Sequence, residues 1–209
     1  MKRIARSKTP DVYTEKRLAT RRRIKRTATR KFSRRGYETT NVSDIVSELN
    51  LSQGSFYYHF PDKKSLLMEI IRDFLEKVKS LAASWAKTTE TGQEAAQLFA
   101  KNMASLLYEN RETARITMKE SNNPDPEIRR VIEEFYKYMY EQTELGLKLG
   151  IGLGVVRPMD TRVAAVALVG MIEKVVIDSL DHRGPFDIDH VINEITNLQN
   201  FGIRPAQKR

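Results

Sequence analysis

Residues 41–60, NVSDIVSELNLSQGSFYYHF, constrain the fold of this chain more than any other stretch. Asn41 is a favourable helix cap, and Asp44 stands three residues later, where its carboxylate can return a hydrogen bond to the backbone in a capping box. Apolar residues then recur at helical spacing as far as Leu49. Asn50 tolerates the left-handed backbone at which helices stop. The pattern therefore predicts a short helix over residues 42–49.

A second short helix follows after a tight turn. Ser52 can cap it, the helix is expected from Gln53 to about His59, and Pro61 ends it. This helix is polar in its first half and aromatic in its second half. Two short helices of which the second presents polar side chains fit the major groove of DNA.

The positive charge of the chain is concentrated around this stretch. Residues 1–60 contain 15 Lys and Arg against 5 Asp and Glu, whereas the other 149 residues contain 21 against 22. The whole net charge of +9 therefore belongs to the segment with the two short helices. Lysine and arginine displace counterions from phosphates, so this distribution favours nucleic-acid binding.

Two other classes of protein are alternatives. A membrane-surface protein also uses basic charge, but it needs a large apolar face with Trp or Phe, and the segment before Asn41 has only Phe32. A helical enzyme is the other alternative. The chain has no cysteine and only three histidines, without the carboxylate–histidine spacing of a metal site. We expect no metal, no cofactor, no membrane span and a cytoplasmic location.

The whole chain is predicted to be all-α, with about nine helices in two domains. A basic flexible arm is expected over residues 1–12, either without a role or adding phosphate and minor-groove contacts. A helix-turn-helix domain is expected over 13–62 and continues into a helix that reaches about residue 78, and a regulatory and dimerisation domain is expected over 63–209. Apolar periodicity predicts helices over residues 14–35, 42–49, 53–59, 63–85, 93–108, 111–120, 127–149, 160–182 and 187–201.

The first of these helices has an apolar seam and a cationic outside. Ile24, Ala28 and Phe32 lie four residues apart, with Leu18 upstream on the same seam, and Gly36 fits a helix end. The cationic residues are either a solvated face or phosphate contacts. They are Arg21, Arg22, Arg23, Lys25, Arg26, Arg30 and Lys31.

The last two predicted helices, residues 160–182 and 187–201, carry more apolar surface than a single-chain core needs. The first of them begins with an almost wholly apolar half. An isologous dimer would bury this surface by pairing the two helices of each chain into a four-helix bundle. The glycine-rich segment 150–158 before them follows a helix and lacks the Gly-Lys-Ser/Thr of a phosphate loop, so we interpret it as a connector.

The residues between Leu18 and Val78 resemble the DNA-binding domain of TetR-family transcriptional regulators. The resemblance is carried by Phe32-x-x-x-Gly36-Tyr37, by Val42-x-x-Ile45-Val46, and by Leu51-Ser52-x-Gly54-Ser55-Phe56-Tyr57-Tyr58-His59-Phe60-x-x-Lys63-x-x-Leu66-Leu67. The rest of the chain agrees with the family in layout. One difference is that Val46 and Leu49-Asn50 stand where the family often has Ala and Ala-Gly.

The resemblance implies a set of DNA contacts. Gln53 is the first choice for base readout, since a glutamine amide can pair with adenine through two hydrogen bonds. Gly54 lets the backbone approach closely, and Phe56 is expected in the core. Contacts with a base or a phosphate are expected from Ser43, Ser52, Gln53, Gly54, Ser55, Tyr57, Tyr58, His59 and Lys63. Structural alternatives remain open for Ser43 as a solvated helix start, Tyr57 as a packing ring and His59 as a packing residue.

The resemblance also implies how such a protein works. It is expected to be a homodimeric repressor that binds a near-palindromic operator in double-stranded DNA, and a small-molecule inducer would release it. Its effector would be apolar or amphipathic. A long-chain lipid or acyl thioester, an aromatic compound and a drug-like cation remain open, as do the operator and the choice between repression and activation. Some of the aromatic and methionine residues of the predicted C-terminal helices could line an apolar pocket, whereas most residues at helical spacing belong to the core, so no lining is assigned. They are Trp85, Phe99, Met103, Met118, Phe135, Tyr136, Tyr138, Met139 and Tyr140.

Overall fold

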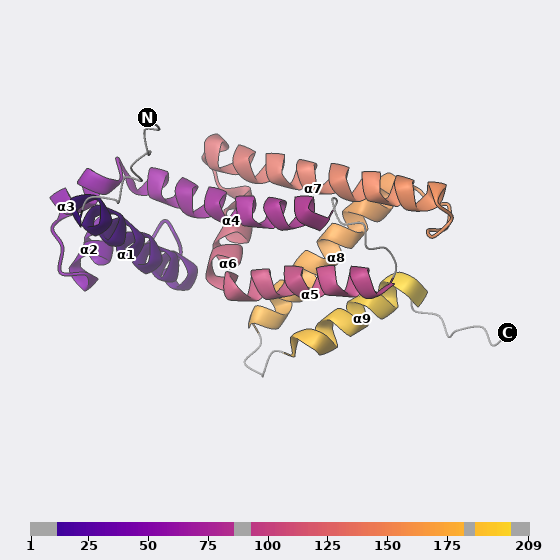
Figure 1. Cartoon of the computed structure of the whole chain (residues 1–209). Helices are drawn as coiled ribbons and strands as arrows, with labels where there is room; N and C mark the ends of the chain where they lie inside the picture. Colours follow the sequence, from indigo (N-terminus) through magenta and orange to yellow (C-terminus); the bar gives the residue numbers. More distant parts are fainter. Residues whose placement is uncertain (1–11, 86–92, 182–186, 202–209) are drawn as a thin grey trace, which may run out of the picture. The chain divides into compact units, whose positions relative to one another are not determined.

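The computed structural model describes residues 12–85, 93–181 and 187–201, and these residues form nine α-helices and one short 3-10 helix, without a strand (Figure 1). The all-α prediction is confirmed. Contacts between residues divide the chain into two compact units, Met1–Ile70 and Ile71–Arg209, and the boundary lies inside a helix. The sequence pattern places the division at 62/63 instead.

The N-terminal unit consists of α1 (Val12–Arg35), α2 (Val42–Glu48), α3 (Gln53–His59) and the first turns of α4 (Lys63–Trp85). Helix α1 packs on α2, and α2 packs on α3. The core of this unit is made of large apolar side chains that are almost wholly buried. They are Ile24, Phe32, Ile45, Phe56, Phe60, Leu66 and Leu67.

The ends of the short helices are satisfied by the groups that the sequence indicated. The backbone N–H of Asn41 donates to Oδ2 of Asp44 over 2.8 Å, and the N–H of Ser55 donates to Oγ of Ser52 over 3.2 Å. Asn50 adopts a φ of +54° and Gly36 a φ of +95°. Both helix stops therefore use the left-handed backbone, which asparagine and glycine adopt at low cost.

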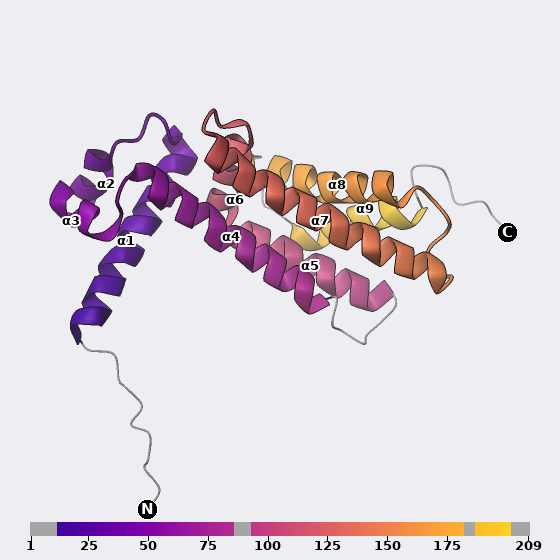
Figure 2. The ribbon, with the colours of Figure 1, turned by 90° about the horizontal axis from the view of Figure 1, so that it is seen from above.

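The C-terminal unit contains the rest of α4 and five further α-helices. These are α5 (Gln93–Glu109), α6 (Arg111–Lys119), α7 (Pro126–Gly152), α8 (Thr161–Asp181) and α9 (Ile188–Phe201), with a 3-10 turn at Glu120–Asn122. Helix α7 lies along α8, and α5 lies against α9 (Figures 1 and 2). Asp125, Asp160 and Asp187 each accept a backbone hydrogen bond at the start of α7, α8 and α9.

Three expectations from the sequence are wrong in part. Helix α1 begins at Val12, a residue predicted to belong to the flexible arm; residues 1–11 lie outside the described ranges. Leu18 is 42% exposed, because at 3.6 residues per turn its position six residues before Ile24 does not lie on the face of Ile24, Ala28 and Phe32. Helix α7 continues to Gly152, three residues into the predicted connector, and the chain turns at Gly154 with a φ of +73°.

Candidate nucleic-acid interface

Helix α3 has one buried face and one open face. Phe56 and the following Phe60 are buried, with ring centroids 5.8 Å apart. Gln53 and Gly54 are exposed, and Tyr57 and Tyr58 are 54% and 61% exposed. The aromatic half of the helix therefore anchors it to the core through one face, while two tyrosines and a glutamine stay in solvent.

The remaining predicted contact residues are placed around this open face. Ser43 is exposed in the first turn of α2, and Ser52 is exposed as the cap of α3. Ser55 and His59 are half-buried. The ring of Tyr57 also packs edge-to-face on Phe56, with centroids 5.5 Å apart, so a packing role and an exposed position coexist in this residue.

Gly54 is not required by the packing of the protein itself. A Cβ atom at this position would have Oγ of Ser52 as its nearest neighbour, at 3.8 Å, which is an ordinary contact. Glycine destabilises a helix by about 1 kcal/mol relative to alanine. The fold therefore gains nothing from glycine here, which is consistent with a position where another molecule approaches the backbone.

Lys63 is held by the protein backbone. Its ammonium donates to the carbonyl oxygens of Tyr37 and Thr40 over 2.9 and 3.1 Å, with a longer contact to Glu38, and it lies 4.3 Å from the ring centroid of Tyr37. These contacts tie the α1–α2 connection to the first turn of α4. The phosphate contact of Lys63 stays a prediction, and the structure adds a stabilising role that the sequence did not indicate.

Arg21 joins three elements of the N-terminal unit. Its guanidinium donates to the carbonyl oxygen of His59 and to the carboxylate of Glu69, and it lies 4.1 Å from the centroid of the Phe60 ring. Lys25 contributes a second contact to Glu69, at 3.3 Å.

Burial lowers the pKa of His59, with further lowering by the nearby charge of Arg21 and then of Arg17. The imidazole is therefore neutral at pH 7 and can donate one hydrogen bond to a phosphate without adding a charge.

A second pair of cationic residues is bound within the unit. Arg30 forms an ion pair with Glu48, and Nζ of Lys31 lies 3.0 Å from the same carboxylate. These contacts join α1 to the end of α2. Arg30 and Lys31 therefore stabilise the packing of α1 on α2. The sequence had indicated only two roles for these cations, a solvated face or phosphate contacts.

Residues 24–70 match the family model of bacterial regulatory proteins of the tetR family. A curated relative, the uncharacterized HTH-type transcriptional regulator YdgC of Bacillus subtilis, is 27% identical over 192 residues, which cover 90% of this chain and 94% of the relative. The chain belongs to the TetR family of transcriptional regulators.

Solved structures of the family share this fold. The TetR-family regulator PfmR of Thermus thermophilus superposes with a TM-score of 0.77 at 24% identity, covering 88% of this chain and all of that one. FadR of Bacillus subtilis, solved with stearoyl-CoA, superposes with a TM-score of 0.71 at 22% identity and covers 88% and 99%. At these identities the superpositions establish the fold of this TetR-family chain.

Membership of the TetR family makes this chain a DNA-binding transcriptional regulator and not an enzyme, since the relatives are regulators. None of the helices in the described ranges combines the length and the apolarity that crossing a membrane requires. Within those same ranges, no group of three or more His, Asp or Glu side chains is placed to hold a metal ion.

The C-terminal unit of this TetR-family chain places a polar pair between two of its helices. Tyr136 on α7 lies near Glu173 on α8, and its ring stacks on Tyr140 with 6.0 Å between the ring centroids. Burial raises the pKa of Tyr136 well above its usual range, and the nearby Glu173 raises it further. Of the other aromatic and methionine residues that could belong to a pocket or to the core, Met103 and Phe135 are buried in the core, and the side chain of Trp85 lies outside the described part of the chain.

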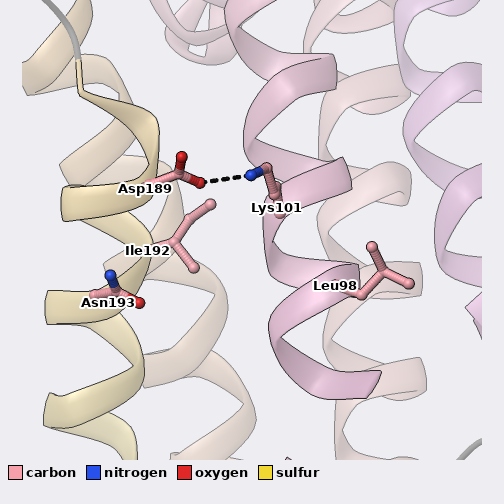
Figure 3. A pocket seen from close by; sticks show the side chains of 5 residues that line it. All are labelled: Leu98, Lys101, Asp189, Ile192 and Asn193. Carbon is pink, nitrogen blue, oxygen red and sulfur yellow. Dashed lines mark ion pairs between the residues drawn. The ribbon is translucent and has the colours of Figure 1, made fainter. Parts of the chain in front are cut away.

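A shallow pocket of about 280 Å³ lies between α5 and α9 (Figure 3). Leu98 and Lys101 line it from α5, and Asp189, Ile192 and Asn193 line it from α9. Lys101 and Asp189 form an ion pair of 2.8 Å across it. Three of the five lining residues are polar, and both ion-pair partners are exposed, so this pocket does not have the enclosed apolar character that a long acyl chain needs.

Replacement of Lys63 by alanine is expected to destabilise the protein. The carbonyl oxygens of Tyr37 and Thr40 lose their donor, which costs about 1–3 kcal/mol. Urea unfolding of the full chain, followed by circular dichroism, measures the change in the free energy of unfolding. Lys137→Ala, which removes the same charge from a side chain that is 75% exposed, is the control.

The same variant separates the structural role from the predicted phosphate contact. If Lys63 binds a phosphate directly, the Lys63→Ala protein should show a slope of log K against log salt concentration that is smaller by about 0.9. Equal stability of the Lys63→Ala and Lys137→Ala proteins would contradict the structural role.

Proposed function

We propose that this chain is a homodimeric repressor that reads a near-palindromic operator through α3 and leaves it when an amphipathic effector binds. The observation that carries the DNA-reading part is the open face of α3. A buried aromatic anchor holds the helix, while Gln53, Gly54, Tyr57 and Tyr58 remain exposed. Base readout in a major groove requires an exposed side chain that both donates and accepts hydrogen bonds, beside a backbone that can come close.

The roles proposed within this face follow the chemistry of each side chain. Gln53 reads a base, and Gly54 allows close approach of the backbone. Ser55 is the second choice for base readout. Tyr57 and His59 contact phosphates, Tyr58 contacts a thymine methyl group or the backbone of the DNA, and Ser43 and Ser52 contribute at the helix starts. The cytoplasmic location expected from the sequence stays a prediction.

The dimer is proposed on the surface of α8 and α9. Both helices carry apolar stripes, and some of their apolar side chains are exposed to solvent. Val163 is 64% exposed, and Val166 and Leu198 are also exposed. A second copy of the chain that pairs the same two helices would remove these side chains from water. Two N-terminal units at a fixed spacing would then meet two half-sites of an operator.

The effector class is proposed from a structural relative. FadR of Bacillus subtilis was solved with stearoyl-CoA, and its fold covers most of this chain. We propose an acyl thioester as the effector, in keeping with the apolar or amphipathic ligand expected from the sequence. An aromatic compound and a drug-like cation are the alternatives that a ligand screen would reveal.

Sequence-specific DNA binding is tested by selection from a pool of duplexes with a randomised centre of about 20 base pairs, enough for two half-sites. The full chain should enrich a near-palindromic sequence, and fluorescence anisotropy should give a higher affinity for it than for a scrambled duplex. Gln53→Ala should relax the preference at one base step by about 1–3 kcal/mol, whereas Gln142→Ala, at an exposed position on α7, should leave it unchanged.

The Gly54→Ala variant separates the effect of Gly54 on protein stability from its effect on DNA binding. Its unfolding midpoint should be equal or higher, because the added methyl group has room and alanine favours the helix, yet its affinity for the selected duplex should fall. Gly146→Ala, also an exposed helical position with open space, is the control. Failure to enrich any sequence would contradict the repressor proposal, and an unchanged preference in Gln53→Ala would move base readout to Ser55 or Tyr58.

The dimer is tested by sedimentation of the full chain. The protein should sediment at twice its chain mass of 24.1 kDa at roughly micromolar concentration. Val163→Glu should shift it to the monomer and weaken binding to the selected duplex, because a carboxylate would be buried in the apolar interface. Val155→Glu, at a more exposed valine outside α8 and α9, should remain dimeric. A monomeric wild-type protein would overturn the proposal.

The effector proposal is tested with stearoyl-CoA below its micellar concentration. It should stabilise the full chain against unfolding, by about 2.7 kcal/mol at a hundred times its Kd, and should release the selected duplex. Coenzyme A without the acyl chain is the control and should do neither. Binding by coenzyme A alone, or no response to acyl thioesters of any length, would exclude this effector class.

A further inference from the structure

Arg21 lies on α1, yet its contacts are to the end of α3 and to α4. One guanidinium nitrogen donates to the carbonyl oxygen of His59, the last residue of α3, and the other donates to Glu69 on α4. The guanidinium carbon lies 4.1 Å from the Phe60 ring centroid. One side chain thus joins α1 to two consecutive helices, through contacts that span 38 and 48 residues of the chain.

The contact to His59 satisfies a group that the helix leaves open. The last carbonyl oxygens of any α-helix lack an intrahelical donor, and a cation at this end also opposes the helix dipole. The guanidinium is a rigid planar fork, so two hydrogen bonds and a ring contact together fix its orientation. Lys25 also binds the carboxylate of Glu69, at 3.3 Å. The acceptor of Arg21 is therefore itself held in place.

Helix α3 depends on such external contacts because it is only seven residues long. Isolated helices of this length are not stable in water. Its start is held by the Ser52 cap and its middle by the buried Phe56. Its end is held by Arg21 and Phe60. A binding site works only when its side chains stay within about 0.5 Å of the productive geometry. A loosened end would therefore lower discrimination between sequences before it abolished binding.

We propose that Arg21 is a positioning residue that sets the pose of α3 in the major groove and so contributes to sequence discrimination without contacting DNA itself. The proposal rests on the proposed function, in which α3 reads the bases. The proposal gives Arg21 a role that differs from that of the exposed cations of α1, whose side chains can bind phosphates. The side chain of Arg21 is 35% exposed, and its donors face His59 and Glu69.

The two roles of an arginine here predict different results. A phosphate contact raises the affinity for all sequences alike and adds about 0.9 to the slope of log K against log salt concentration. A positioning residue changes the ratio between the affinities for the selected and the scrambled duplex and leaves the salt slope unaltered. The ratio and the slope, measured on the full chain by fluorescence anisotropy, therefore decide between them.

Arg21→Ala should lower the ratio of selected to scrambled affinity about tenfold or more, since it removes a charge-assisted cap and an ion pair. Arg22→Ala is the matched control: it removes the same charge from the next residue, which is exposed, and should leave the ratio unchanged. Glu69→Gln keeps Arg21 but weakens its anchor, and should lower the ratio by about threefold. The double variant should lose little more than Arg21→Ala alone, because both act through one contact.

A spectroscopic readout checks that the contact, and not the fold, has changed. Removal of Arg21 takes a positive charge away from His59, so the pKa of His59, followed by NMR of the free protein, should rise toward its ordinary value of 6.5. The shift should occur in a protein whose circular dichroism is that of the wild type. If Arg21→Ala does not fold, Glu69→Gln decides by the same ratio.

The outcomes are separate from those of the proposed function. A wild-type protein that prefers no sequence would remove the proposed function and this inference together. A preference that survives in both Arg21→Ala and Glu69→Gln would overturn the inference alone. An unchanged ratio with a lower salt slope would also overturn it, and would assign Arg21 to a phosphate.

Discussion

The N-terminal unit depends on how two seven-residue helices are held at their ends. Neither α2 nor α3 is long enough to be stable by itself, so every contact at their termini matters. The starts are closed by local groups, Asp44 for α2 and Ser52 for α3. The last carbonyl oxygens of α2 accept from the backbone of residues 49–51, whereas the carbonyl oxygen of His59 at the end of α3 accepts from Arg21, a residue of α1. Ion pairs of Glu48 with Arg30 and Lys31 also join the end of α2 to α1. The result is a short helix, α3, with one face packed in the core and the other exposed to solvent.

This arrangement gives the positive charge of the segment two functions. Arg30 and Lys31 pair with Glu48, and Arg21 and Lys25 pair with Glu69, so four cations of α1 join helices. Lysine and arginine elsewhere on α1 are exposed and keep their long-range attraction for phosphates. The field that draws the protein to DNA and the contacts that orient α3 therefore come from one helix. A regulator needs both, because attraction without orientation gives binding without discrimination.

In the C-terminal unit, the contact between α7 and α8 is not purely apolar. Tyr136 on α7 lies near Glu173 on α8, and the ring of Tyr140 stacks beside it. The phenol of the half-buried Tyr136 keeps its proton throughout the physiological range, because burial and the nearby Glu173 both raise its pKa. A polar, protonated side chain therefore lies among the contacts between these two helices. The described pocket, between α5 and α9, is separate from this pair and contains the ion pair of Lys101 with Asp189.

The sequence by itself determined the helices, their caps and the family. Helix boundaries follow from hydrophobic period and from local capping groups, which lie within four residues of the groups they satisfy. The left-handed turn at Asn50 is such a case, where a side chain that tolerates positive φ stands in place of the usual glycine. Only the tertiary structure decided which cations bind carboxylates and carbonyl oxygens. The contact between Arg21 and Glu69 spans 48 residues, and Lys63 reaches carbonyl oxygens 23 and 26 residues away. No periodic pattern encodes these pairings, because they depend on how the helices pack.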